Sequence, residues 1–389
     1  MTENKRIGEY VTCAMGSPEP YRAYIPPPLP PQPPLDMERL YPMLEKANLA
    51  LGRLEGISTL LPDISLFLYM YIRKEAVLSS QIEGTQSTLT DLLSHEANEA
   101  PGVPIHDVQE TSCYVAAMTY GLERIQELPL SLRLLREIHD ILLSHSRGKD
   151  KDPGEFRRSQ NWIGGFRPGH ARYVPPPPER LMEVLDAFEK FLHDRSVRLP
   201  ILVKAALAHV QFESIHPFLD GNGRLGRLLI TLMLCVEGVM KEPLLYLSLY
   251  LKTHRQAYYD HLQSVRETGD WESWIEFFLT GVRETADHAV ETAQAVLKLF
   301  EKDRGAIRQA GSSKAAALAV HEHLQRHPVT NTTMIKKSSG LSAQTVLRGL
   351  AVLESLGMVQ EITGKERYKK YAYTAYMDIL NKGTEPLER

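Results

Sequence analysis

The sequence predicts a mainly α-helical protein with a small β-hairpin near its middle and a C-terminal unit of the winged helix-turn-helix type. Three observations support this. Apolar residues recur at three- and four-residue spacing along most of the chain, which indicates amphipathic helices. Glycine and proline interrupt that spacing at residues 144–180. From Ser313 the pattern becomes three short helices followed by two strand-like runs.

The first elements are an extended arm and a helical region. Residues 1–35 are rich in proline, with PPPLPPQPP at 26–34, so we expect an N-terminal arm lying along the fold. Helical spacing begins at Asp36, and the N-terminal helical region is predicted to span residues 36–107, with its second helix over 65–80.

A central region is predicted over residues 108–300. Its apolar spacing predicts seven helices, over 108–125, 131–143, 179–192, 202–215, 224–237, 254–266 and 271–299. Between the second and third of these, short runs at 161–163 and 171–174 are separated by glycine and proline. We expect a β-hairpin flap near 156–176, ended by Pro175–Pro178.

Composition excludes several classes of protein. The 389 residues are 43% hydrophobic and 24% charged with a net charge of −3, which is ordinary for a globular protein of two or three domains. The cysteines Cys13, Cys113 and Cys235 are far apart, which argues against a disulfide framework or a cysteine zinc site. No run of 18 apolar residues and no apolar leader are present, so we expect a cytoplasmic protein.

The segment from His216 to Arg227, HPFLDGNGRLGR, carries the chemistry. Its glycines precede the helix predicted at 224–237, so backbone N–H groups and the positive helix end suit a phosphate. Arg224 and Arg227 share a helical face and suit phosphate oxygens. Asp220 offers a hard oxygen to Mg²⁺, and His216 could act as a general base.

Two other interpretations of this segment compete with this one. Residues 221–226 formally match GxGxxG, but the preceding residues look helical rather than strand-like, which argues against a Rossmann site. His216 could instead cap a helix, with the glycines in a tight turn and the arginines on the surface. That reading fits each residue alone but not the whole segment.

The segment resembles the signature of the Fic family, HPFx(D/E)GNGRxxR, at every fixed position, and the resemblance covers about residues 36–300. It implies a Fic-type helical core that transfers AMP from ATP to a Ser, Thr or Tyr hydroxyl of a protein. By this resemblance His216 is the catalytic base and Asp220 holds Mg²⁺. The nucleotide would be bound by the rest of the segment, namely Gly221, Asn222, Gly223, Arg224, Leu225, Gly226 and Arg227.

The resemblance also implies roles for the flap and for a tyrosine pair. In the family a β-hairpin beside the site pairs with the target segment, and here its residues would be Asn161, Trp162, Ile163 and Gly164. An ordinary surface hairpin is the alternative. Tyr258, with Tyr259, resembles a tyrosine site near the adenine, although a packing role fits nearly as well.

Residues 79–84, SSQIEG, match the inhibitory pattern (S/T)xxxE(G/N) of many Fic proteins. Ser79 and Glu83 are four residues apart and therefore share a helical face. A carboxylate beside Arg227 would form a charge-assisted pair and prevent productive seating of ATP. A solvent-facing glutamate is the alternative. By family resemblance, the same glutamate could instead position water for the removal of AMP.

The C-terminal region, residues 313–389, has 11 Lys/Arg against 7 Asp/Glu and is therefore basic. A helix over 342–356 and strands near 358–362 and 367–373 are predicted, with the turn TGKE at 363–366 between the strands. Side chains that could meet DNA phosphates are Arg348, Lys365, Arg367, Lys369 and Lys370.

Three functional hypotheses follow: an autoinhibited adenylyltransferase, a de-AMPylating hydrolase on the same site, and a DNA-binding regulator. The expected partners are ATP, Mg²⁺ and a protein substrate that could be the chain itself. For the C-terminal region, dimerisation or target docking is favoured over DNA binding, and a homodimer is expected from family habit.

Overall fold

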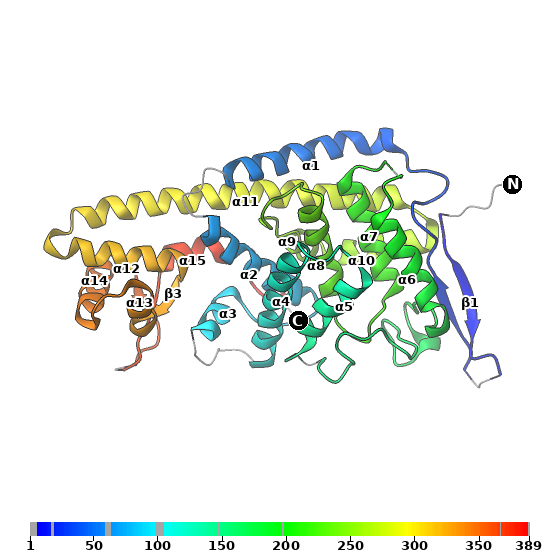
Figure 1. Ribbon diagram of the computed structural model, residues 1–389, viewed down its shortest axis with the longest axis horizontal. Helices are drawn as coiled ribbons and strands as arrows, with labels where there is room; N and C mark the ends of the chain where they lie inside the picture. Colours follow the sequence, from blue (N-terminus) through cyan, green and yellow to red (C-terminus); the bar gives the residue numbers. More distant parts are fainter. Residues whose placement is uncertain are drawn as a thin grey trace.

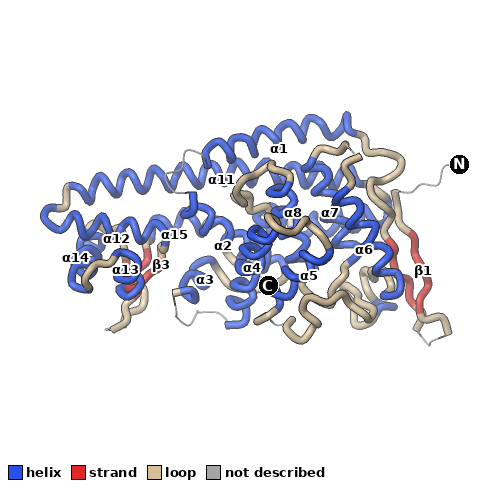
Figure 2. The backbone as a smooth tube through the Cα atoms, viewed as in Figure 1, coloured by secondary structure: helices blue, strands red, loops and turns tan. Residues whose placement is uncertain are grey.

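Helices form most of the structure (Figures 1 and 2), which confirms the predicted mainly α fold class. The computed structural model describes the chain except for residues 1–5, 17–18, 59–63, 98–104, 147, 197, 366 and 388–389. Within those described parts, no helix combines the length and the apolar character that a membrane span requires.

Two long helices run side by side along the molecule (Figure 1), α1 (Met37–Ser58) and α11 (Trp271–Arg308). At 1.5 Å per residue, α11 is about 57 Å long. The sequence predicted its end near residue 299. It continues because Phe300 and Ile307 are buried, and the Phe300 ring packs against Tyr373 and Tyr376 of the C-terminal region.

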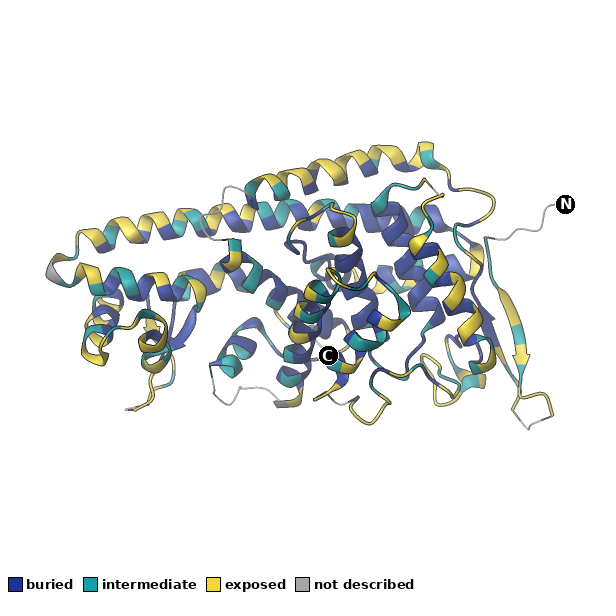
Figure 3. Ribbon diagram, viewed as in Figure 1, coloured by how far each residue is buried: buried dark blue, intermediate teal, exposed yellow. Residues whose placement is uncertain are grey.

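A buried helix pair forms the centre of the fold, α7 (Ile201–Ile215) and α8 (Asn222–Val236). All residues of α7 from Leu202 onward are buried, because this helix is largely apolar all round and neighbours cover every face (Figure 3). The surrounding helices are α2 (Ile64–Ile82), α3 (Leu89–Glu96), α4 (Ile105–Arg124), α5 (Leu132–Leu143), α6 (Pro178–His193), α9 (Ser248–Thr253) and α10 (Arg255–Thr268).

The N-terminal arm contains a hairpin that the sequence analysis missed. Strands β1 (Glu9–Cys13) and β2 (Tyr21–Ile25) are antiparallel, and the proline-rich segment follows them. The alternation of aromatic, β-branched and polar residues was a signal for these strands, but the prolines dominated the interpretation. The far edge of β2 meets the flap, where Tyr24 N donates to Val174 O at 2.8 Å.

The flap has less regular structure than the predicted hairpin. Its pairing is one antiparallel bridge between Ile163 and Tyr173, with Ile163 N donating to Tyr173 O at 2.8 Å. No named strand forms there among the described residues. Gly164 and Gly165 have positive φ angles, and a 3₁₀ turn, η1 (Pro168–His170), closes the loop, so the ladder cannot extend.

Most of the C-terminal region lies at the opposite end of the molecule from β1 and β2, and its last described residues return toward the middle (Figure 1). It follows the 3₁₀ turn η2 (Gly311–Ser313), and its antiparallel sheet has the strand order β3-β5-β4. Its elements are α12 (Lys314–Arg326), β3 (Val329–Asn331), α13 (Thr332–Ser339), α14 (Ala343–Ser355), β4 (Gln360–Glu361), β5 (Lys370–Ala372) and α15 (Thr374–Asn381). Winged-helix identity stays a prediction, and Glu366 of the expected turn lies outside the described residues.

Candidate active site

His216 lies at the end of α7 in a left-handed conformation, with φ +48°. Its N–H donates to Phe212 O, and Pro217 cannot continue the helix. The turn is fixed by Arg157, which is 2% exposed and whose Nε donates to His216 O at 2.9 Å. The same guanidinium donates to Pro176 O at 2.5 Å. Arg157 therefore positions His216, a role that the sequence analysis did not assign.

The His216 imidazole is held in its neutral form. Burial, together with the nearby charges of Arg157 and Arg266, lowers the pKa of His216 to about 3. A neutral imidazole can accept a proton from a substrate hydroxyl.

The loop after His216 is closed by Asn222, whose Oδ1 accepts from Phe218 N at 2.9 Å and whose Nδ2 donates to Phe218 O at 2.8 Å. Gly221 has φ +77°, which favours glycine. Helix α8 then begins at Asn222. The first N–H groups of a helix have no partner within the helix, so this end can bind an anion.

Asp220 is held at this loop by His139 of α5. Gly154 N donates to His139 Nδ1 at 2.9 Å, so Nε2 carries the proton and donates to Asp220 O at 3.0 Å. The His139 ring stacks on Phe218 with centroids 3.7 Å apart. Burial lowers the pKa of His139 to about 4, which keeps this ring neutral.

The Asp220 carboxylate fits a Mg²⁺ ligand. It is 42% exposed, and its Oδ1 accepts from Gly221 N at 2.6 Å. Its hard oxygens border the cavity at the start of α8. Within the described residues, no group of three or more His, Cys, Asp and Glu side chains could hold a metal.

The two motif arginines have different partners. Arg224 Nη1 pairs with Glu110 Oε1 of α4 at 2.6 Å, and both side chains are buried, at 4% and 8% exposed. Its Nη2 lies 3.4 Å from Asp220 Oδ1. Glu110 is 114 positions from Arg224 in the chain, and nothing in the sequence pattern linked them.

Arg227 meets the end of α2. Its Nη2 donates to Glu83 Oε1 at 2.6 Å and to Ser79 O at 3.0 Å, and its Nε donates to Ser79 Oγ at 2.9 Å. The pair expected from the sequence is thus present. Although burial opposes ionisation of both groups, their attraction lowers the pKa of Glu83 and raises that of Arg227. A Cβ on Gly223 would collide with Glu83 Oε1, so this carboxylate covers the first turn of α8.

Two cavities meet at these residues. One of about 310 Å³ is lined by Asp220 and Glu110, and one of about 610 Å³ is lined by Tyr258 and Tyr259. Residues that border both are Glu83, Trp162, His216 and Gly223. The Glu83 carboxylate therefore lies where the two spaces join.

The remaining predicted nucleotide contacts differ in their access to these cavities. Tyr258 is 1% exposed, and its hydroxyl lies 2.8 Å from His209 Nε2, so it also has a packing role. Leu225 is fully buried in the core. A Cβ on Gly226 would meet Glu213 Oε1 at 2.6 Å. The Leu225 side chain and the Cβ direction of Gly226 therefore face the protein interior, and a nucleotide contact at these two positions stays a prediction.

The flap borders the same site. Asn161 Nδ2 donates to Phe218 O at 3.1 Å and to Leu219 O at 3.2 Å, which ties the flap to the motif loop. Trp162 and Ile163 are 36% and 37% exposed, and Gly164 lines the larger cavity. These residues are accessible beside His216.

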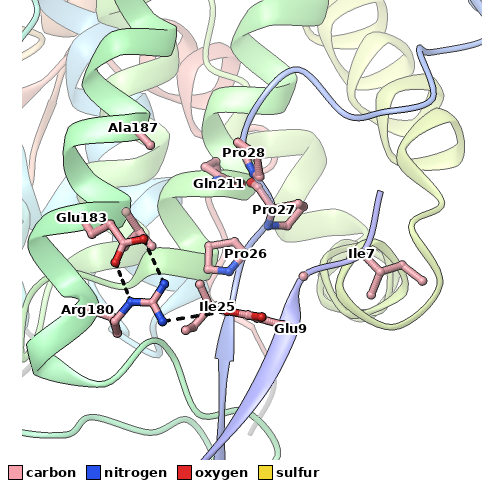
Figure 4. Close-up of a pocket in the computed structure, with 12 residues that line it drawn as sticks. Ile7, Glu9, Ile25, Pro26, Pro27, Pro28, Arg180, Glu183, Ala187 and Gln211 are labelled. Carbon is pink, nitrogen blue, oxygen red and sulfur yellow. Dashed lines mark hydrogen bonds and ion pairs between the residues drawn. The ribbon is translucent and has the colours of Figure 1, made fainter. Parts of the chain in front are cut away.

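A further cavity of about 540 Å³ lies away from the motif, between the N-terminal arm and α6 (Figure 4). Arg180 at its wall pairs with Glu183 and approaches Glu9, so its charge is already compensated. Gln211 Nε2 donates to Pro27 O at 2.8 Å. This cavity has the character of a packing gap beneath the arm.

One predicted DNA contact is wrong. Lys370 is 1% exposed, and its Nζ donates to Ser94 O at 2.9 Å, so it cannot reach a phosphate. Its position on a short inner strand directs it toward α3. Side chains that remain exposed are Arg348, Lys365, Arg367 and Lys369.

Comparisons with known proteins identify two domains. The Fic/DOC family N-terminal domain matches residues 41–123, and the Fic/DOC family domain matches residues 129–234. The protein adenylyltransferase Fic of Aedes aegypti is 38% identical over 162 residues, covering 41% of this chain and 29% of that protein. That of Culex quinquefasciatus is 33% identical over 204 residues, covering 50% and 37%. The matches thus span less than half the length of these relatives.

Solved structures share the fold. A Fic family protein from Desulfovibrio desulfuricans has a TM-score of 0.54 at 20% identity, over 85% of this chain and 96% of that one. A Fic domain containing signaling protein from Bacteroides thetaiotaomicron has a TM-score of 0.51 at 19% identity, over 64% and 98%.

Proposed function

The chain is a Fic/DOC family protein over residues 41–123 and 129–234, and on this premise we propose that it transfers AMP from ATP to a hydroxyl group of a protein. The observation that carries the proposal is the convergence of a neutral His216, the first turn of α8 and Arg227 where two cavities meet. A base, an anion site and a cationic clamp are what nucleotidyl transfer requires.

In this mechanism the phosphates of ATP lie against the first turn of α8, with Arg224 and Arg227 as counter-charges. His216 accepts the proton of the attacking hydroxyl, whose oxygen forms a bond to the α-phosphorus. The bond from that phosphorus to the β-phosphate oxygen breaks, and pyrophosphate leaves. Mg²⁺ at Asp220 would supply positive charge against the phosphate oxygens.

We further propose that Glu83 inhibits this reaction. Its carboxylate occupies Arg227 and lies against Gly223, where phosphate oxygens would have to be. The Glu83 carboxylate and an ATP phosphate would repel each other if both were bound to Arg227. Productive ATP binding therefore requires the end of α2 to move. Target pairing along Asn161–Gly164 is part of the same proposal and is supported by the exposure of that segment beside His216.

The two alternatives stay predictions. Removal of AMP would use the same His216 and Arg227, with Glu83 positioning the attacking water. DNA binding would use the exposed basic residues of the C-terminal region. Label that accumulates on protein supports transfer, whereas label that is lost from an AMP-modified protein supports removal.

The test incubates Glu83→Gly protein with Mg²⁺ and ATP labelled at the α-phosphate, beside ATP labelled at the γ-phosphate. We expect α-label but no γ-label on the chain itself or on a lysate protein, and no α-label when His216→Ala is added. Transfer of γ-label would indicate phosphorylation. No transfer of either label, from ATP or from other nucleotides, would refute the proposal.

A further inference from the structure

The helix that carries Glu83 is held from its other side by the C-terminal tail, defined here as residues 382–385. Two α2 side chains donate to backbone carbonyls of this tail. Lys74 Nζ donates to Lys382 O at 2.8 Å, and Gln81 Nε2 donates to Thr384 O at 2.8 Å. Gln81 lies between Ser79 and Glu83, so this contact is at the inhibitory end of the helix.

Both donors are removed from water, and the tail supplies an acceptor to each. Lys74 is fully buried and Gln81 is 1% exposed. Burial lowers the pKa of Lys74 to about 8. Gln81 Nε2 also donates to Ser87 O at 2.8 Å, so without the tail it would lose one of two acceptors. Because a buried ammonium or amide that loses an acceptor is destabilised, loss of the tail carbonyls would destabilise this position of α2.

The tail is itself anchored next to α2. Lys252 of α9 donates to Gly383 O at 3.0 Å and also to Glu385 O. Thr384 is 2% exposed. Gly383 has φ +80°, and a Cβ there would lie 2.6 Å from Leu249 Cδ1, so the tail passes close to α9 in a conformation that favours glycine.

The tail also continues directly from the C-terminal region. Helix α15 precedes it, and Asn381 Nδ2 donates to Thr90 Oγ1 at 3.1 Å. Lys370 of β5 donates to Ser94 O of α3. A displacement of the C-terminal region would therefore withdraw acceptors from the helix that places Glu83 on Arg227.

We propose that residues 382–385 position the end of α2, and that Lys74 and Gln81 couple the C-terminal region to the inhibitory contact of Glu83 with Arg227. The inference rests on the proposed function, which it deepens by assigning a regulatory input. Lys74 and Gln81 are positioning residues, because they act on the site through α2. Release of the tail raises AMP transfer only in a protein that still has Glu83.

The experiment displaces the tail in two independent ways. Gly383→Val introduces a side chain at a positive φ angle and against Leu249, and Lys74→Met removes the donor to Lys382 O. Gly357→Val is the matched control, because Gly357 has φ +69° in the same region but nothing within 4 Å of its Cβ position. Each change is made with Glu83 intact and in Glu83→Gly protein.

The first readout is amide exchange at the end of α2, where Glu83 N donates to Ser80 O at 3.1 Å and Gly84 N to Gln81 O at 3.0 Å. The loss of one hydrogen bond shifts the opening equilibrium of the helix end about fivefold. We therefore expect amide exchange to be about fivefold faster in both tail variants and unchanged in the control. Unchanged exchange in the tail variants would overturn the proposal.

The second readout is transfer of α-label to the chain or to lysate protein. We expect about a fivefold increase with Glu83 present and no change in Glu83→Gly protein. Equal changes in both backgrounds would indicate general destabilisation and overturn the coupling. Should Glu83→Gly protein itself transfer no label, the proposed function fails, and exchange alone decides the positioning role of the tail.

Discussion

Replacing Glu83 by Gln separates the charge of the inhibitory side chain from its volume. Glutamine has nearly the same size, so it can still lie against Gly223, but it cannot form an ion pair with Arg227. Glycine removes both. If charge holds Arg227 away from ATP, the Gln variant transfers AMP faster than wild type, and the Gly variant is faster still.

The magnitude follows from the contact. Hydrogen bonds to charged groups contribute about 1.5–3 kcal/mol to stability. The Glu83–Arg227 contact is 2.6 Å long, with Arg227 2% exposed, but Glu83 is 35% exposed and water weakens the pair. A discounted value of about 1–2 kcal/mol corresponds to an increase of about 5- to 30-fold in the competent population. We therefore expect the Gln variant to transfer AMP about 5- to 30-fold faster.

The assay measures the initial rate of α-label transfer at saturating Mg²⁺ and at an ATP concentration well below its KM, where competition with Glu83 is not overcome by excess ATP. Glu276→Gln is the matched control, because the Arg39–Glu276 pair is also 2.6 Å long and Glu276 is also 35% exposed, but it joins α1 to α11. The control should leave the rate unchanged. A Gln variant as slow as wild type beside a fast Gly variant would refute the charge argument and leave only volume.

Three further predictions concern the residues around the motif. Burial and neighbouring cations lower the pKa of His216 to about 3, so its imidazole stays neutral as the pH falls toward about 6. The transfer rate of Glu83→Gly protein should therefore be level between about pH 6 and 8. A rate that falls with a midpoint near the ordinary histidine pKa of about 6.5 would contradict this. His139→Phe keeps the stacking on Phe218 but loses the donor to Asp220 O, so we expect the Mg²⁺ concentration for half-maximal rate to rise about tenfold. An unchanged Mg²⁺ titration would exclude a role for that hydrogen bond. Arg157→Met leaves the carbonyls of His216 and Pro176 without this donor and should lower the free energy of unfolding by about 2–4 kcal/mol in urea titrations; a loss below about 0.5 kcal/mol would show that water replaces it.

Local signals in the sequence were sufficient for the motif and for most of the long helices, but not for the short helices α9 and α15. The spacing of apolar residues predicted the helices of the core, because a helix with one buried face has apolar residues at every third or fourth position. Ser79 and Glu83 were identified from six consecutive positions, and their contact with Arg227 is present. The N-terminal hairpin was missed because proline outweighed the alternating pattern of β1 and β2.

Contacts between distant segments were not predictable in this way. Glu110, His139 and Arg157 support Arg224, Asp220 and His216 from other elements, and a single sequence carries no record of such pairings. The burial of Lys370 was missed for the same reason: a lysine in a basic segment looks solvated until the helix that accepts its hydrogen bond is known. The tail acceptors that contact α2 are backbone carbonyls, which every residue has, so the identity of the tail residues could not reveal these contacts.

The close approach of Glu83 to Gly223, which leaves no room for a Cβ, limits how this protein could gain activity by mutation. The glycine that brings Glu83 close to α8 is also the one proposed to bring phosphate close, so changes within 216–227 that disturb inhibition would disturb catalysis as well. A genetic selection for hyperactive alleles should therefore return changes in α2 and in the segments that hold it, and almost none in the motif. Mutations that make the protein constitutively active should therefore arise in α2 and its supporting segments, and rarely in residues 216–227.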